Sequence, residues 1–429
     1  MVTDSPTILL EAIQIREAIS PETIKREVGS TTLSDKLTKW LNEIGLKVNP
    51  FEELDASRDP YIPFYLVDHD QFKIINGKHP SFVFAPAGGG KSAFRVRLAR
   101  ECRIWESNQN IFPIIYKLPR PDILLSQFGK EQHLNHLCHY AAQELLLYLA
   151  YHPTKINQEN CPIDLIQQSL QWDVNLIYHL KQLAENGNLE PFVLSFDRTA
   201  GLLPNPPGKD DILVFCAEMA KGVKIDSPKP DPEKRFEILL NLLHKLGFDT
   251  FFILIDGVDA YFETARDPII GMKAITWFLN KSFEWSQKGI FIKYFLPIEM
   301  LRIIEAKYKN LLTSDAKIAI IKWDTNTLRE VIQQRLHKAS GGKFNSLRAI
   351  SNRALRGAEQ SPEEMLIQQI ITLGLLPSPR DVIKAIHWLF LYHVQQPNSQ
   401  EKLTPQDMVA TCEWIRDQRS ITSRTSHLI

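Results

Sequence analysis

The sequence lacks several patterns that would place it in a specialised class of protein. Its five cysteines are scattered, odd in number and form no C-x-x-C pair, which is typical of a protein kept in a reducing cytosol. No apolar run approaches the ~20 residues needed to span a bilayer. The first twenty residues carry early acidic charge and do not have the pattern of a signal peptide. We therefore expect a cytoplasmic protein without a membrane partner.

The sequence also has no excess of positive or negative charge. The 50 Lys and Arg residues balance the 50 Asp and Glu residues, so the global charge favours neither nucleic acid nor an anionic membrane as a partner. Hydrophobic residues make up 44% of the 429 residues and charged residues 23%. This composition is enough for a full core, in two or three domains or in one large domain with additions.

Glycine is sparse, with 19 residues, yet three glycines stand in succession. The stretch FVFAPAGGGKSAFRVRL (82–98) combines an apolar run, a glycine loop and a helix-compatible segment in that order. It fits the phosphate-loop pattern G-x-x-x-x-G-K-[ST], with Ala85 in the place of the first glycine. Such a loop points successive backbone N–H groups at phosphate oxygens, and the following helix directs its positive end at the same anion. The alternative is an ordinary glycine-rich turn that happens to contain Lys-Ser.

The residue types of the loop predict a site for ATP and Mg²⁺. The Lys91 ammonium can reach the β- and γ-phosphates, and the Ser92 hydroxyl can ligate magnesium. We expect the nucleotide to be bound by seven consecutive residues, Ala87, Gly88, Gly89, Gly90, Lys91, Ser92 and Ala93.

A second segment offers the carboxylate that a phosphate loop needs for magnesium. The run TFFILI (250–255) predicts a buried strand, and Asp256 follows it directly. Because open parallel sheets bind ligands at the carboxyl ends of their strands, we expect Asp256 to hold magnesium opposite Ser92. Asp259 is then placed to orient the attacking water. The alternative is a strand-ending Asp-Gly turn without chemistry.

The apolar runs and periodic segments together predict an α/β fold. Strands expected near residues 82, 111, 250, 289 and 316 alternate with helices, which is the pattern of a doubly wound parallel sheet. We expect three parts, namely an N-terminal helical segment (1–47), an α/β core with a helical insertion at about 122–234 (48–325), and a C-terminal helical region (326–429).

The segment TFFILIDGVDAYFE resembles the Walker B segment of the additional-strand P-loop ATPases, the group that includes the AAA+ and STAND families. The lead-in NPFEELDASRDPY is similar to that of bacterial members, and LLPSPRD (375–381) is similar to the sensor-2 entry of their helical lid. The resemblance covers about residues 47–120 and 235–415. It implies a P-loop NTPase core with a C-terminal helical lid, in which Arg380 contacts the γ-phosphate. It also implies an ATPase that switches conformation between its ATP and ADP states and acts on a protein partner or on another copy of itself.

Three departures from that family pattern bear on turnover. Ala260 stands where the family usually has an acid, so hydrolysis is expected to be slow or to rest on Asp259. The stretch Lys293–Pro297, where sensor 1 is expected, contains no Asn or Thr. No arginine finger can be named. A nucleotide-binding scaffold with little turnover therefore stays open as an alternative.

The other alternative is a nucleic-acid-associated ATPase of the transposition or replication loader type. The segment after the glycine loop carries four arginines, and a solvated basic face is a simpler interpretation of them than a nucleic-acid stripe. These residues are Arg95, Arg97, Arg100 and Arg103.

A histidine-rich segment raises the question of a zinc site. His133, His136, Cys138 and His139 stand close together, but no second ligand cluster accompanies them, and the surrounding pattern is that of an amphipathic helix.

Overall fold

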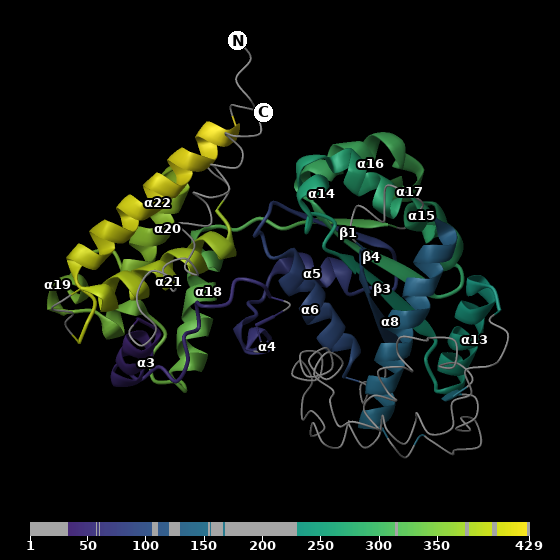
Figure 1. Ribbon diagram of the computed structural model, residues 1–429, viewed down its shortest axis with the longest axis horizontal. Coiled ribbons are helices and arrows are strands. Elements are labelled where there is room, and N and C mark those ends of the chain that lie inside the picture. The colour runs from purple at the N-terminus through teal and green to yellow at the C-terminus, as the bar shows by residue number, and fades with distance from the viewer. Residues whose placement is uncertain are drawn as a thin grey trace, which may run out of the picture. The chain divides into compact units, whose positions relative to one another are not determined.

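The computed structural model describes residues 33–56, 58–59, 61–104, 110–119, 129–152, 155, 166–167, 230–313, 316–373, 377–396 and 401–426 (Figure 1). The chain divides into two compact units. Unit 1 consists of Met1–Leu54, Phe64–Val67 and Lys322–Ile429, and unit 2 of Asp55–Pro63 and Asp68–Ile321. The predicted helices within 1–32 and most of the predicted insertion at 122–234 lie outside the described residues.

Unit 2 is built on a five-stranded, all-parallel sheet, which confirms the predicted α/β fold. Its strands pair in the order β2-β3-β4-β1-β5. All five predicted strands are present, and the last, expected near residue 316, has four residues. They are β1 (Ser81–Ala85), β2 (Ile111–Lys117), β3 (Thr250–Asp256), β4 (Ile290–Pro297) and β5 (Lys317–Ile320).

The central strands β1 and β3 are largely apolar because both of their faces are covered. All five residues of β1 are buried, and in β3 only Asp256 is not fully buried. Strands covered on both faces do not alternate between apolar and polar residues. After Thr250, the run FFILI (251–255) therefore has no polar position before the strand ends at Asp256.

Helices cover both faces of this sheet (Figure 1). Phe82 and Phe84 share one apolar cluster with the helices α8 (Lys130–Tyr151), α13 (Pro232–Lys245) and α15 (Pro268–Ser286). Successive side chains of a strand point to opposite faces, so the buried Val83, which is outside that cluster, faces the other layer. That layer contains α5 (Asp70–Ile75) and α6 (Lys91–Cys102).

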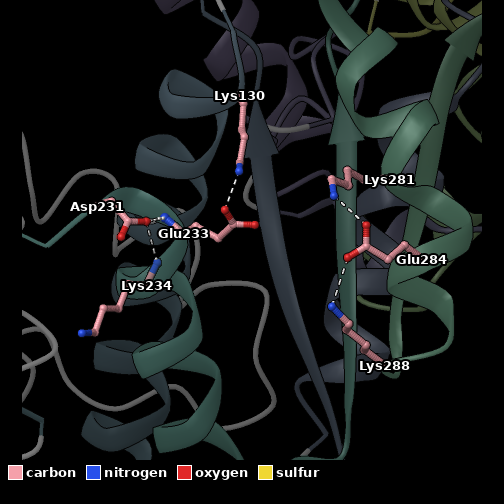
Figure 2. Close-up of polar contacts among 7 residues, drawn as sticks. All are labelled: Lys130, Asp231, Glu233, Lys234, Lys281, Glu284 and Lys288. Atoms are coloured by element: carbon pink, nitrogen blue, oxygen red, sulfur yellow. Dashed lines mark hydrogen bonds and ion pairs between the residues drawn. The ribbon is translucent and has the colours of Figure 1, made fainter.

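A capping carboxylate defines the start of α13, and an ion pair joins α13 to α8 (Figure 2). The Asp231 carboxylate accepts hydrogen bonds from the backbone N–H groups of Glu233 (3.0 Å) and Lys234 (3.1 Å), and Pro232 occupies the first turn. Glu233 also pairs with Lys130 at the start of α8. The end of α13 is equally well defined, since Gly247 has the positive φ of 98° that suits a residue following a helix.

Short helices in the connections of unit 2 complete the layer structure. Two short helices precede β1, namely α4 (Ile62–Tyr65), whose residues are divided between the two units, and α5. Four connecting helices were not predicted, because runs of three to seven residues are too short to show a helical period. They are α14 (Phe262–Arg266), η2 (Ile298–Met300), α16 (Leu301–Lys307) and α17 (Lys309–Thr313).

The regular elements of unit 1 are helices, as far as its described residues go. It contains α3 (Leu33–Glu43), α18 (Thr325–Ala339), η3 (Leu347–Ile350), α19 (Arg353–Arg356), α20 (Pro362–Thr372), α21 (Pro379–Gln395) and α22 (Pro405–Ser426). The N-terminal α3 packs on α21, with the rings of Trp40 and Phe390 edge to face at 5.2 Å. The N-terminal segment and the C-terminal helices, predicted as separate parts, thus share one core. No described helix has both the length and the apolar character needed to cross a bilayer.

Candidate phosphate-binding site

The glycine loop joins β1 to α6 through a backbone that requires glycine at all three positions. Gly88 and Gly90 have φ values of 76° and 90°, which side chains with a Cβ rarely adopt. A Cβ on Gly89 would lie only 2.9 Å from both the Ala85 Cβ and the Pro86 carbonyl oxygen. The loop is therefore a tight turn that leaves no room for a side chain at these three positions. Ala87, also predicted to bind the nucleotide, is exposed in the loop.

Lys91 is the first residue of α6, and its side chain folds back over this loop. Its Nζ donates to the carbonyl oxygens of Ala85 and Pro86, both at 3.2 Å. The same Nζ lies 2.9 Å from an oxygen of the Asp259 carboxylate. Two residues predicted for one site, distant in the chain, thus meet in an ion pair whose side chains are 6% and 20% exposed.

Asp256 is the last residue of β3, and both of its oxygens have partners. Oδ1 accepts a hydrogen bond of 2.8 Å from the N–H of Gly257, which has a φ of 77°. Oδ2 lies 3.0 Å from Nε of Arg95. These side chains are shielded too, with 11% of Asp256 and 8% of Arg95 exposed.

The two ion pairs form one set of charges at the carboxyl edge of the sheet. Lys91 and Arg95 are four residues apart on α6 and therefore lie on the same face of that helix. They meet Asp259 and Asp256, which flank the turn after β3. Two positive charges thus face two negative charges, largely out of water, where electrostatic interactions are stronger than at an exposed surface.

The donor atoms near Asp256 fit magnesium better than a softer metal. No group of three or more His, Cys, Asp or Glu side chains is suitably placed for a metal within the described ranges. Magnesium keeps several water ligands and needs only one or two carboxylates, together with phosphate oxygens. The Asp256 carboxylate and the Ser92 hydroxyl, in the first turn of α6 beside Ala93, are oxygen donors of this kind. Arg95 is one turn beyond Ser92 and already occupies one oxygen of Asp256.

Arg95 is a residue of this site that the motif analysis missed. The interpretation of the four arginines after the loop as a solvated basic face is wrong for two of them. Arg95 is 7% exposed, and Arg103 is 1% exposed and forms two hydrogen bonds with Glu144, of 2.5 and 2.7 Å. The outward Arg97 pairs with Asp68 at 2.7 Å. The position of Arg95, four residues after Lys91, was the available signal.

Arg380 lies in the other unit. It is the second residue of α21, is exposed, and follows Ser378, whose hydroxyl caps that helix. The structure brings together the glycine loop, Asp256 and Asp259 within unit 2, whereas Arg380 belongs to unit 1. Its contact with the γ-phosphate stays a prediction.

Lys293 lies in the stretch where sensor 1 is expected, but its ammonium binds the segment before β1. Its Nζ donates to the carbonyl oxygens of Gly77 (2.6 Å) and His79 (2.7 Å) and to the Ser81 hydroxyl (3.1 Å). It also lies 4.4 Å from the centre of the Phe252 ring. Ser81 begins β1, so the ammonium points to the amino end of that strand, away from the glycine loop. Burial lowers the pKa of Lys293 to about 7.

The histidine-rich segment is part of α8, and His133 belongs to the core. Its ring stacks on Trp277 at 5.3 Å, and its Nδ1 is 2.7 Å from the Tyr116 hydroxyl. Burial, together with the neighbouring His136, lowers the pKa of His133 to about 3. The neutral ring shares this hydrogen bond with the Tyr116 hydroxyl, whose own pKa burial raises well above its usual value.

Comparisons with known proteins add no relative to this description. No protein-family model, curated protein or solved structure matches the chain.

Proposed function

We propose that the chain binds ATP with magnesium at the loop between β1 and α6 and hydrolyses it, using the change of nucleotide state as a conformational switch. The observation that carries the proposal is the position of Lys91. Its ammonium lies over the glycine loop, at the positive end of α6, and 2.9 Å from a carboxylate of the turn after β3.

Each side chain of the set has a role in this proposal. The loop N–H groups and Lys91 bind the β- and γ-phosphates. Ser92 and Asp256 hold magnesium, which when bound neutralises phosphate charge. Asp259, which contacts Lys91, is close enough to the phosphate position to orient a water molecule or to compete for the lysine.

The order of the strands supports the proposed relationship to the additional-strand P-loop ATPases. β4 lies between β1, which carries the glycine loop, and β3, which ends at Asp256. The two motif strands are therefore separated by one further strand, as the name of that group implies. The distribution of arginines gives no support to the alternative of a nucleic-acid loader, because Arg95 and Arg103 are used in buried ion pairs.

Nucleotide binding to a lysine variant tests the proposal. Lys91→Ala should weaken the binding of ATP and ADP at least tenfold in calorimetry and abolish ATP turnover, because a charge-assisted contact to phosphate is worth roughly 1.5–3 kcal/mol. Lys78→Ala is the matched control, since Lys78 pairs with Asp249 before the amino ends of the strands, with its side chain 52% exposed.

The control should bind ATP as the unaltered protein does. Equal ATP affinity of the Lys91→Ala, Lys78→Ala and unaltered proteins, with circular dichroism showing all three to be folded, would refute the proposed site.

A further inference from the structure

We propose that Arg95 competes with magnesium for the Asp256 carboxylate and thereby sets how strongly nucleotide binding depends on magnesium. This inference rests on the function proposed above and names a residue that regulates the same site. Nothing in the phosphate-loop pattern requires an arginine four residues after the lysine.

The first step concerns the carboxylate itself. The Gly257 N–H occupies one oxygen of Asp256 and the Arg95 guanidinium the other. A magnesium ion that bound Asp256 directly, or through an ordered water, would have to share or replace one of these partners. Of the two, the arginine side chain can rotate away, whereas the N–H is fixed in the backbone next to Asp256.

The second step concerns charge. Arg95 lies one helical turn beyond Ser92, so a cation held between Ser92 and Asp256 would approach the guanidinium. Two cations at short range in a site this well shielded repel each other strongly. Magnesium should therefore be bound more weakly while Arg95 stays on Asp256 than it would be without the guanidinium.

The third step concerns the alternative partner for Arg95. A nucleotide in the glycine loop would bring phosphate oxygens to Lys91, on the same face of α6 as Arg95. A guanidinium binds phosphate as readily as carboxylate. Arg95 can thus exchange Asp256 for phosphate when magnesium binds, and it can neutralise part of the phosphate charge when magnesium is scarce.

The experiment is a magnesium titration at a fixed concentration of a fluorescent ADP analogue, using the full chain. Arg95→Met keeps the length of the side chain without its charge. We expect the magnesium concentration for half-maximal ADP binding to fall roughly ten- to hundredfold in Arg95→Met, as for the loss of a buried charge-assisted competitor. ADP binding without magnesium should weaken at the same time.

Arg97→Met is the matched control, because Arg97 lies on the same helix but pairs with Asp68 and Glu101. It should leave the magnesium midpoint unchanged. If Arg95 only anchors α6 to β3, Arg95→Met will lower thermal stability and leave the magnesium midpoint at the value of the unaltered protein, which would overturn the proposal. Should Arg95→Met fail to fold, Arg95→Gln replaces it, because it also removes the charge, with the same expected fall in the midpoint and the same overturning result.

The Lys91→Ala variant separates this inference from the function on which it rests. If the unaltered protein binds ADP no better than Lys91→Ala at any magnesium concentration, the proposed function fails and the role of Arg95 fails with it. If ADP binds and Lys91→Ala abolishes the binding, but the magnesium midpoint is the same in the unaltered, Arg95→Met and Arg97→Met proteins, only the role of Arg95 is refuted.

Discussion

The two ends of the parallel sheet in unit 2 both shield cationic side chains from water, but they give them different partners. At the carboxyl end, Lys91 and Arg95 each face a carboxylate. At the amino end, Lys293 is surrounded by two carbonyl oxygens, a hydroxyl and an aromatic ring, and none of its hydrogen-bond partners among the described residues is a carboxylate.

The difference distinguishes a site that can exchange ligands from one that only holds the fold. A buried ion pair is a weak source of stability, since desolvation offsets much of its attraction, but either partner can take a new ligand of the right charge. A buried lysine with dipolar partners lacks the compensating charge, and its proton is correspondingly easier to lose. The carboxyl end is thus suited to binding, and the amino end to fixing residues 77–81 against β4.

The largest expected effect tests the amino end. The pKa of Lys293 is about 7 in the folded protein, compared with 10.5 for an ordinary lysine. Between pH 7 and pH 10.5 the unfolded chain therefore binds one proton more than the folded protein. Stability should therefore rise with pH, by about 3 kcal/mol from pH 7.5 to 9.5, at about 1.4 kcal/mol per pH unit. Lys293→Met should remove that part of the pH dependence in urea unfolding followed by circular dichroism. Parallel pH profiles of the two proteins would contradict a lysine with a lowered pKa.

A smaller effect is expected from His133, another buried base of unit 2. The pKa of His133 falls from 6.5 to about 3 on folding, so the unfolded chain binds the extra proton in this range. Stability should fall as the pH is lowered through it, by about 2 kcal/mol between pH 6.5 and 4.5. His133→Gln keeps an acceptor for the Tyr116 hydroxyl but does not titrate. The difference between the two proteins should shrink towards pH 4.5, and a constant difference would contradict the prediction.

The smallest expected effect tests the exchange of partners at the carboxyl end. Asp259→Asn removes the charge that competes with phosphate for Lys91, and we expect ADP without magnesium to bind roughly three- to tenfold tighter, for a contact worth about 1 kcal/mol. ATP turnover should fall if Asp259 also orients the water. Asp249→Asn, at the surface pair with Lys78, is the control. Weaker ADP binding by Asp259→Asn would show that Asp259 supports the nucleotide instead of competing with it.

Local sequence patterns predicted where the strands and helices are, but they did not predict which of these elements pack against each other. The strand at 250–255 was predictable because a strand covered on both faces is rich in apolar residues. The strand order was not predictable in this way, since each pairing joins segments far apart in the chain. The packing of α3 on α21 could not be predicted from the sequence for the same reason.

The candidate site shows the same limit. The pattern around Lys91 and the position of Asp256 at a strand end were enough to predict where the charges lie. The ion pairs Lys91–Asp259 and Arg95–Asp256 were not predictable in this way. They depend on how α6 lies against the end of β3 and on how far the side chains extend between them. Sensor 1 was expected in the stretch Lys293–Pro297, but the side chain of Lys293 is directed to the opposite end of β1 from the glycine loop.

The position of β4 has a consequence for the order in which the chain folds. β4 is made after both β1 and β3, yet it lies between them and pairs with each. A ribosome-bound chain that has not yet released residues 290–297 can form the glycine turn and can pair β2 with β3, but it lacks the strand that joins these two halves. Insertion of a central strand between segments formed earlier is a non-local and therefore slow step. Until it occurs, the apolar edges of β1 and β3 stay open to other chains, so this interval is when the nascent protein most needs protection from aggregation.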